Sequence, residues 1–369
     1  MAASKSSWPE VAAVVGLLTV IISVLLTAFA WPAVRSSVHD VPIAVAGPAA
    51  ATGQVTAALE QRMPGAFDVT LVADSAAAEA AILDREVYGA IDLSTGKPQV
   101  LIASAASASV AQALQQVATG LAQAAPGPQG ATGNAGTAGR SDSPGAAGTQ
   151  AAPGAAGAQG PAVTVRDVAA LPADDPRGAG LAAGSLPLII GGLLAALLLT
   201  NRVRGTGRRI AGAFAFAVTG GLAIAAILQF WFGSLGGDYW LNAGVVALST
   251  AAISLTLLGL ESLLGLPGFG LGAAVMMLVG NPLSGMATAP QMLPGWSGAL
   301  GQLLPPGAAG TLLRSTAFFD GAGAIQPLIV LLAWLALGTT LCLLSGLRKS
   351  RRAAPADITA AEPVPAVVA

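Results

Sequence analysis

The sequence predicts an α-helical polytopic membrane protein with a small extracytoplasmic α/β domain between its first and second spans. Of the 369 residues, 54% are hydrophobic and 9% are charged, whereas about a quarter are charged in an ordinary soluble domain. Several apolar runs reach the roughly 20 residues that a helix needs to cross a bilayer. The long stretch between the first two runs instead alternates strand-like and helix-like patterns.

Six runs qualify as candidate spans. They cover residues 11–30, 181–200, 210–232, 240–260, 263–280 and 327–346. The fifth run is the weakest helix of the six, because Pro267 and several glycines interrupt it.

Basic residues near the membrane ends predict the orientation, since cytoplasmic loops carry an excess of Lys and Arg. One cluster lies between the second and third spans and another follows the sixth: Arg202, Arg204, Arg208, Arg209, and Arg348, Lys349, Arg351, Arg352. Both clusters are therefore expected inside, which places both termini in the cytoplasm and residues 31–180 outside. We expect a multi-pass protein of the cell membrane. Alternatively, the Ala28-Phe29-Ala30 tripeptide resembles a signal-peptidase site, and cleavage after Ala30 would leave five spans.

The chain divides into five parts on this basis. Residues 1–31 form a cytoplasmic tail and the first span, residues 32–125 the α/β domain, and residues 126–180 a linker rich in Gly, Ala and Pro. Residues 181–346 form a five-helix membrane domain, and residues 347–369 a cytoplasmic tail.

The α/β domain is predicted from alternating short patterns between Pro42 and Ala124. IAVAG, FDVTLVA, VYGAIDL and QVLIAS have the composition of strands, and three alanine-rich segments between and after them have that of helices. The domain is interpreted either as a sensor or substrate-handling unit or as a structural cap.

Glycine recurs with a period of three from Gly127 to Gly139, and again in the same phase from Gly145 to Gly160 with one interruption at Ala151. This register is collagen-like, but the proline content is low and a triple helix tolerates interruptions poorly. The tract is therefore predicted to be a flexible linker.

No motif for catalysis, metal or cofactor binding is found. The chain has one His and one Cys, no G-x-x-x-x-G-K-[ST], no H-E-x-x-H and no C-x-x-C. We therefore expect no enzyme, no cofactor and no metal site. A net charge of −1 also argues against nucleic acid as a partner.

Ionisable residues near the membrane give the candidate functional positions, because charge there is costly and often functional. Glu261, between the fourth and fifth spans, is a candidate for coupling to a cytoplasmic partner, although hydration at an interfacial turn explains it equally well. Residues 281–320 are rich in Pro and Gly and lie between two apolar runs. Non-helical backbone at membrane depth survives only when it is buried or lines a cavity. We therefore expect a re-entrant-like segment, with Arg314 and Asp320 near its end as candidate gate residues.

Three segments carry a family resemblance: DREVYGAIDLS with GKPQVLIASAASASVAQAL, DDPRGAGLAAGSLPLIIGG, and the long segment from NPLSGMATAPQMLPGW to LLRSTAFFDG. With them the chain resembles the YhgE/Pip (phage infection protein) branch of the membrane subunits of type 2 ABC exporters, in its actinobacterial style. The resemblance implies an export-type fold, a pair of subunits around a transmembrane path, a separate cytoplasmic ATPase and a re-entrant gate before the last span.

Two functions follow as hypotheses. The first is a permease-like subunit of an ABC-type exporter, which moves an unknown substrate outward and has as partners the lipid bilayer, a cytoplasmic ATPase and a second copy of the chain. The second is a non-transporting receptor or envelope scaffold, whose outer domain binds a partner.

Overall fold

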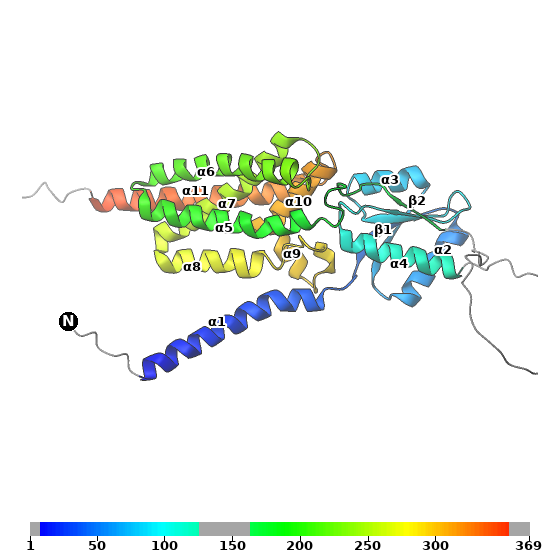
Figure 1. The fold of residues 1–369 in the computed structure, drawn as a ribbon, viewed down its shortest axis with the longest axis horizontal. Helices are drawn as coiled ribbons and strands as arrows, with labels where there is room; N and C mark the ends of the chain where they lie inside the picture. Colours follow the sequence, from blue (N-terminus) through cyan, green and yellow to red (C-terminus); the bar gives the residue numbers. More distant parts are fainter. Residues whose placement is uncertain (1–7, 125–162, 354–369) are drawn as a thin grey trace, which may run out of the picture.

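A computed structural model describes residues 8–124 and 163–353 of the chain. These residues form a bundle of helices with an α/β domain at one end (Figure 1). Most of the glycine-rich tract predicted as a linker lies outside the described residues.

The α/β domain has the order of elements that its sequence patterns predict. The elements are β1 (Val41–Ala46), α2 (Ala49–Arg62), β2 (Phe67–Val72), α3 (Ser75–Leu83), β3 (Gly89–Asp92), β4 (Gln99–Ile102) and α4 (Ala108–Ala124). Strand β1 is buried at nearly every position, as expected for a central strand whose sequence is a continuous apolar run. Asp74 caps α3 by accepting a hydrogen bond from the amide of Ala77.

A fifth strand, β5 (Thr164–Asp167), completes the sheet, whose order is β2-β1-β3-β4-β5. Strands β1, β2 and β3 are parallel, β4 is antiparallel to β3, and β5 is parallel to β4. These four residues were predicted to be part of the linker. All four residues of this edge strand (TVRD) are exposed. The strand therefore buries no apolar face, and its sequence shows no alternation that would predict a strand.

Five helices among the described residues are long and apolar enough to cross a membrane. They belong to α1 (Trp8–Arg35), α5 (Ala179–Arg202), α6 (Thr206–Ala226) with the π-helix η1 (Ile227–Trp231), α7 (Tyr239–Leu264) and α11 (Ile325–Ala353). Helix α7 is the most buried of them and packs against α5, α6 and α11. The chain therefore has the helices of a membrane protein built around one central helix.

The fifth expected span is a shorter helix. Gly265, at φ +71°, ends α7 and reverses the chain. Nine residues of α8 (Leu266–Ala274) follow and lie alongside α7, and six residues of the π-helix η2 (Val275–Gly280) then contact α10 and α1. This segment falls short of the roughly 20 residues of a complete span.

Residues 281–320 form a compact segment of short helices. These are η3 (Pro290–Met292), α9 (Ser297–Gln302) and α10 (Pro305–Phe318). Pro305 and Pro306 begin α10, where a missing amide hydrogen costs nothing. Helix α10 is almost entirely buried and packs against α7 and α11. The segment is thus part of the bundle core without spanning it.

The α/β domain rests directly on this segment. Ala289 and Met292 belong to the hydrophobic core beneath one face of the sheet, and Phe319 belongs to the core beneath the other. The backbone amide of Ser37 also donates a 3.0 Å hydrogen bond to the carbonyl oxygen of Met292. The domain and the bundle are therefore packed together rather than tethered.

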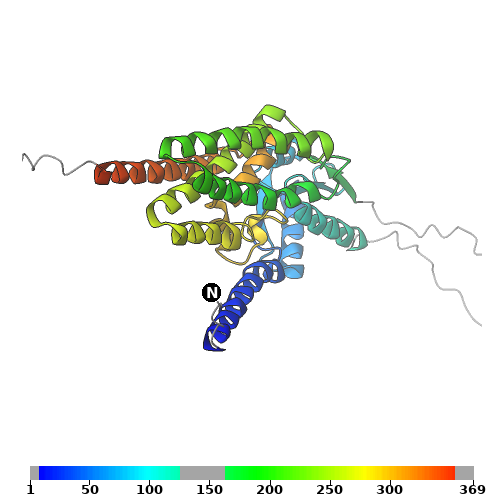
Figure 2. The same ribbon diagram turned by 60° about the vertical axis from the view of Figure 1, so that its left-hand side comes forward.

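Helix α1 stands apart from the other long helices (Figures 1 and 2). Its apolar side chains are mostly exposed, including Val15, Leu18 and Ile22, and it contacts the bundle near η2. The helix continues through Ala30 to Arg35. In Figure 1 the first described residues of α1 and the end of α11 lie at the end of the bundle opposite to the α/β domain.

Candidate functional site

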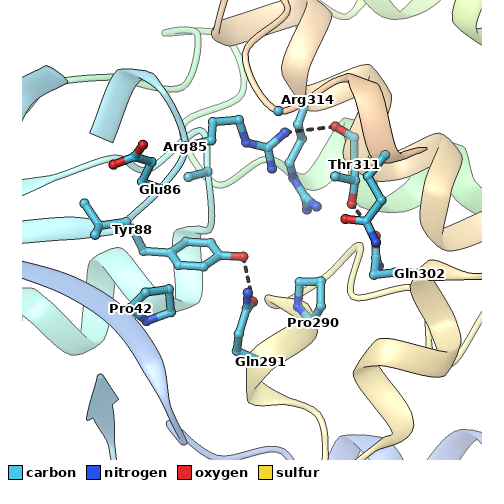
Figure 3. Close-up of a pocket in the computed structure, with 13 residues that line it drawn as sticks. Pro42, Arg85, Glu86, Tyr88, Pro290, Gln291, Gln302, Thr311 and Arg314 are labelled. Carbon is cyan, nitrogen blue, oxygen red and sulfur yellow. Dashed lines mark hydrogen bonds between the residues drawn. The ribbon is translucent and has the colours of Figure 1, made fainter. Parts of the chain in front are cut away.

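A polar cavity of about 260 Å³ lies where the α/β domain meets the 281–320 segment (Figure 3). We call it the junction cavity. The domain contributes Pro42, Arg85, Glu86, Val87, Tyr88 and Ala106, and the bundle contributes Pro290, Gln291, Gln302, Thr311, Arg314, Gly323 and Gln326. The cavity exists only because the two parts are docked.

Arg85 enters the cavity from the end of α3. It follows the C-cap residue Asp84 and has φ +61°, a left-handed conformation that costs a non-glycine residue roughly 1–2 kcal/mol. Its Nη1 donates hydrogen bonds to the carbonyl oxygen of Thr311 at 3.0 Å and to the Oγ of Ser315 at 2.5 Å. Its guanidinium also lies 5.3 Å from the centre of the Phe319 ring. These contacts hold an otherwise unfavourable backbone conformation in place.

Arg314 comes from the opposite side, on α10. Its side chain is buried, with 7% of the residue exposed, and its Nη2 donates a hydrogen bond to the carbonyl oxygen of Met286. Loss of hydration lowers the pKa of Arg314 to about 10, so the guanidinium stays protonated at neutral pH. The same cause lowers the pKa of Arg85.

Neither guanidinium has a carboxylate partner among the described residues. Within residues 8–124 and 163–353, the ion pairs within 4.0 Å are His39–Asp40, Arg166–Glu79 and Arg209–Glu261. Figure 3 shows the carboxylate of Glu86 directed away from both arginines. An uncompensated buried charge costs several kcal/mol. Two arginines against the single carboxylate of Glu86 give the cavity lining a net positive charge, and no carboxylate of the described residues lies within 4.0 Å of either guanidinium.

Neutral polar groups complete the walls. The hydroxyl of Tyr88 donates a 2.7 Å hydrogen bond to Oε1 of Gln291, and burial raises the pKa of this phenol, so it remains a neutral donor. The hydroxyl of Thr311 donates to Oε1 of Gln302 at 2.6 Å, and Nε2 of Gln302 donates to the carbonyl oxygen of Ser284 at 2.9 Å. These bonds fix the side chains around the two arginines.

This arrangement can bind an anion. Arginine presents a planar set of N–H donors that match the oxygens of a phosphate or carboxylate. The guanidinium groups of Arg85, from the α/β domain, and Arg314, from α10, line one cavity. The described residues contain no group of three or more His, Cys, Asp or Glu side chains that is able to hold a metal ion.

The three residues predicted from the sequence fall in different places. Arg314 lines the junction cavity. Asp320 is exposed in the turn after α10, at φ +47°, and does not line it. Glu261 lies at the far end of α7, where its Oε2 is 3.5 Å from Nη1 of Arg209 and accepts a 3.3 Å hydrogen bond from the hydroxyl of Thr200.

Arg85, Tyr88, Gln291, Gln302 and Thr311 also line the cavity and were not predicted from the sequence. No local pattern marks them, because the contact between Arg85 and Thr311 joins residues 226 positions apart. The cavity also lies at the edge where β1 and β3 begin, as the lining residues Pro42 and Tyr88 show. Ligands of parallel sheets usually bind at the opposite, carboxyl edge.

Comparison of the chain with protein-family models, with curated proteins and with solved structures finds no match.

Proposed function

We propose that this chain is the membrane-embedded, permease-like subunit of an export system of the cell membrane, with a separate cytoplasmic ATPase as its energy source. In this proposal the junction cavity binds an anionic group of the substrate before release on the outer side. The observation that carries the proposal is the buried guanidinium of Arg314, which has no carboxylate partner among the described residues and lies on a helix that does not span the bundle.

The energetics of Arg314 support a binding role. Replacing even a buried ion pair by apolar side chains is often neutral or stabilising, and a buried charge without a partner has no ion-pair attraction to offset its desolvation. A contribution to stability therefore explains Arg314 poorly. Charged residues at membrane depth face cavities and mark substrate pathways more often than they serve packing. A substrate anion would supply the ion-pair partner that Arg314 lacks among the described residues.

The architecture of the 281–320 segment supports a gate. Broken helices occur at membrane depth only where protein or a water-filled cavity surrounds them. Helix α10 is buried among α7, α11 and the α/β domain and contributes Thr311 and Arg314 to the cavity wall. A displacement of this segment would open or close the cavity toward the bundle.

The proposed topology has both termini inside and six membrane passes, with α8 and η2 as the incomplete fifth pass. Both described ends of the chain lie opposite to the α/β domain (Figure 1). Arg202, Arg204 and Arg208 lie at the α5–α6 connection, and the excess of positive charge there favours the cytoplasmic side.

An ATPase would have to dock at this same end. The connection between α5 and α6 consists of Val203, Arg204 and Gly205, which leaves no room for a further helix. Its position is also fixed, because the side chain of Arg209 donates 2.8 Å hydrogen bonds to the carbonyl oxygens of Thr200 and Val203. The α5–α6 connection is therefore too short and too constrained to be the main docking element.

The turn between α7 and α8 is a better candidate for docking. Leu264 and Leu266 flank this turn and are largely exposed. Clustered apolar side chains at a surface are common where another protein binds. We propose this turn, next to Glu261, as the docking surface for the ATPase.

Affinity purification in a mild detergent, followed by mass spectrometry, tests the proposal. An ATPase recovered in stoichiometric amount, and lost with the double variant Leu264→Asp, Leu266→Asp, would support it. A matched double variant at lipid-facing positions, Leu194→Ala with Leu198→Ala, should retain the ATPase. Recovery of the chain alone, or with envelope proteins only, would contradict an ATPase-driven exporter.

One observation favours the second candidate, a receptor or scaffold. A mainly apolar groove of about 230 Å³ runs between α2 and α4 on the α/β domain, lined by Val55, Leu59, Met63, Val117 and Leu121 among others. An exposed apolar groove is a common feature of protein-binding surfaces. Recovery of an envelope protein that is lost with Leu121→Asp would favour this function over export.

A further inference from the structure

A second, smaller cavity has both polar and apolar residues in its wall. It has a volume of about 90 Å³, and its polar lining residues are Ser104, Ser107, Arg177, Thr288 and Arg314. Arg314 thus forms part of the walls of both cavities. Arg177 is exposed and has no carboxylate within 4.0 Å among the described residues, so this cavity also carries excess positive charge.

An apolar cavity of about 350 Å³ adjoins this second cavity. It lies between the end of α1, the start of α5 and residues 281–293, and Phe29, Pro32, Leu186 and Leu293 are among its lining residues. Four residues line both cavities: Ala182, Met286, Ala287 and Thr288. A cavity with the guanidinium groups of Arg177 and Arg314 in its wall therefore continues into an apolar one.

The apolar cavity lies beside the gap between α1 and the bundle. Helix α1 stands away from α5 in both ribbon views, and its apolar side chains are exposed along its length. In a bilayer, lipid chains would occupy this gap, because lipid is the only apolar solvent available there. The cavity is therefore accessible from the hydrocarbon core, whereas the junction cavity faces the α/β domain.

From this arrangement we infer that the ligand is an anionic amphiphile. Its apolar chain occupies the cavity between α1 and α5, and its phosphate or carboxylate headgroup binds at Arg314. The ligand enters from the bilayer between these two helices, and its headgroup then reaches Arg85 in the junction cavity. This inference rests on the proposed function for its direction of movement, but the binding site stands without it.

The alternative is a free small anion that enters the junction cavity from the outside. The two ligands share the headgroup chemistry and differ in their need for the apolar cavity. An apolar chain adds affinity through each buried methylene group, so a long-chain ligand should bind far more tightly than its short-chain analogue.

The test uses the purified full chain in nanodiscs of zwitterionic lipid. Tetradecyl phosphate, butyl phosphate and tetradecyl phosphocholine are compared as competitors of a fluorescent alkyl phosphate. We expect tetradecyl phosphate to bind at least tenfold more tightly than either of the others. Equal binding of tetradecyl phosphate and tetradecyl phosphocholine would overturn the assignment of the headgroup site. Equal binding of tetradecyl phosphate and butyl phosphate would overturn the assignment of the site for the apolar chain.

Two pairs of variants locate the site. Arg314→Gln should weaken tetradecyl phosphate at least tenfold, whereas Arg166→Gln, which removes an arginine paired with Glu79 on the α/β domain, should not. Ala182→Leu should weaken tetradecyl phosphate by a larger factor than butyl phosphate, because Ala182 lies where the apolar cavity joins the cavity that contains Arg314. Ala183→Leu, one residue further along and exposed, is the matched control.

Failure of the ligand assignment and failure of the export proposal give different experimental results. If Arg314→Gln does not fold, Arg85→Gln gives a second measurement of the headgroup site from the α/β domain, with a smaller expected loss of about threefold. Specific binding without an associated ATPase would sustain this inference and contradict the export function. An associated ATPase with no preference for tetradecyl phosphate would sustain export and contradict this ligand.

Discussion

Arg85 on the α/β domain donates a 3.0 Å hydrogen bond to the carbonyl oxygen of Thr311 on α10. The same guanidinium nitrogen reaches the hydroxyl of Ser315, one turn further along α10. This single side chain therefore connects the position of the outer domain to the position of the buried helix that carries Arg314. If the α/β domain moves relative to α10, the hydrogen bonds of Arg85 to α10 must break; otherwise α10 must move with the domain.

The first prediction follows from this connection. Arg85→Asn should loosen the domain from α10, because it removes the guanidinium while Asn tolerates the left-handed backbone at this position. Hydrogen–deuterium exchange should increase at residues 84–88 and around Thr311. Arg166→Gln is the control, since its ion pair with Glu79 lies within the domain. Unchanged exchange at α10 in Arg85→Asn would show that Arg85 does not couple the two parts.

Arg314 gives the second prediction, which separates stability from binding. Arg314→Met removes a buried charge that has no carboxylate partner among the described residues, and it keeps a flexible apolar chain. The lost hydrogen bond to Met286 costs about 1 kcal/mol, whereas the relieved desolvation is worth several. We expect an unfolding temperature in detergent that is equal to or above that of the natural chain, together with loss of alkyl phosphate binding. A large fall in the unfolding temperature would assign Arg314 a structural role.

Much of the fold was predictable because local patterns determine it. The apolar runs give the long helices, and the strand and helix patterns from Pro42 to Ala124 give the α/β domain. β5 was missed because an exposed edge strand of four residues carries no alternation. The fifth expected span is short because Gly265 reverses the chain and only nine α-helical and six π-helical residues follow.

The candidate site was predictable only in part. Arg314 could be selected because a charge between apolar runs is conspicuous in a chain of this composition. Asp320 met the same criterion, yet the turn after α10 leaves it exposed. Arg85 sits between Asp84 and Glu86 in a sequence that looks like solvated surface, and only the docking of the domain onto α10 gives it a buried partner. Such contacts depend on tertiary packing and leave no local signal.

The third prediction concerns the close packing inside the 281–320 segment. A Cβ atom at Gly301 would overlap the carbonyl oxygen of Leu283, whereas one at Gly270 on α8 would meet nothing within 4 Å. Gly301→Ala should therefore destabilise the segment, by roughly 1–3 kcal/mol as for other overpacked sites. Gly270→Ala should be neutral or slightly stabilising, since Ala favours a helix. Thermal unfolding of the two variants in the same detergent compares them, and equal midpoints would contradict the packing described.

Glu261 supports a fourth prediction at the other end of the bundle. Glu261→Gln should make the α5–α6 connection more mobile, because it removes the carboxylate charge whose Oε2 lies 3.5 Å from Nη1 of Arg209. The expected loss of stability is about 1 kcal/mol or less for a single ion pair near the surface. Hydrogen exchange at residues 203–209 should rise, with residues 84–88 unaffected as the internal control. If exchange is unchanged while a bound ATPase is lost, Glu261 acts in docking and not in holding the connection.

The last prediction concerns the orientation of the chain in the membrane. The lone cysteine, Cys342, is buried, so a Cys342→Ser background allows single cysteines to be placed at exposed positions. Thr95→Cys lies in a turn of the α/β domain, and Asn201→Cys lies near the end of α5 beside Arg202.

Because cytoplasmic ends carry the excess of Arg and Lys, a membrane-impermeant maleimide should label Thr95→Cys in intact cells and Asn201→Cys only after permeabilisation. The reverse pattern would place the α/β domain inside. It would also place the junction cavity on the cytoplasmic side, which would contradict its proposed role in release on the outer side.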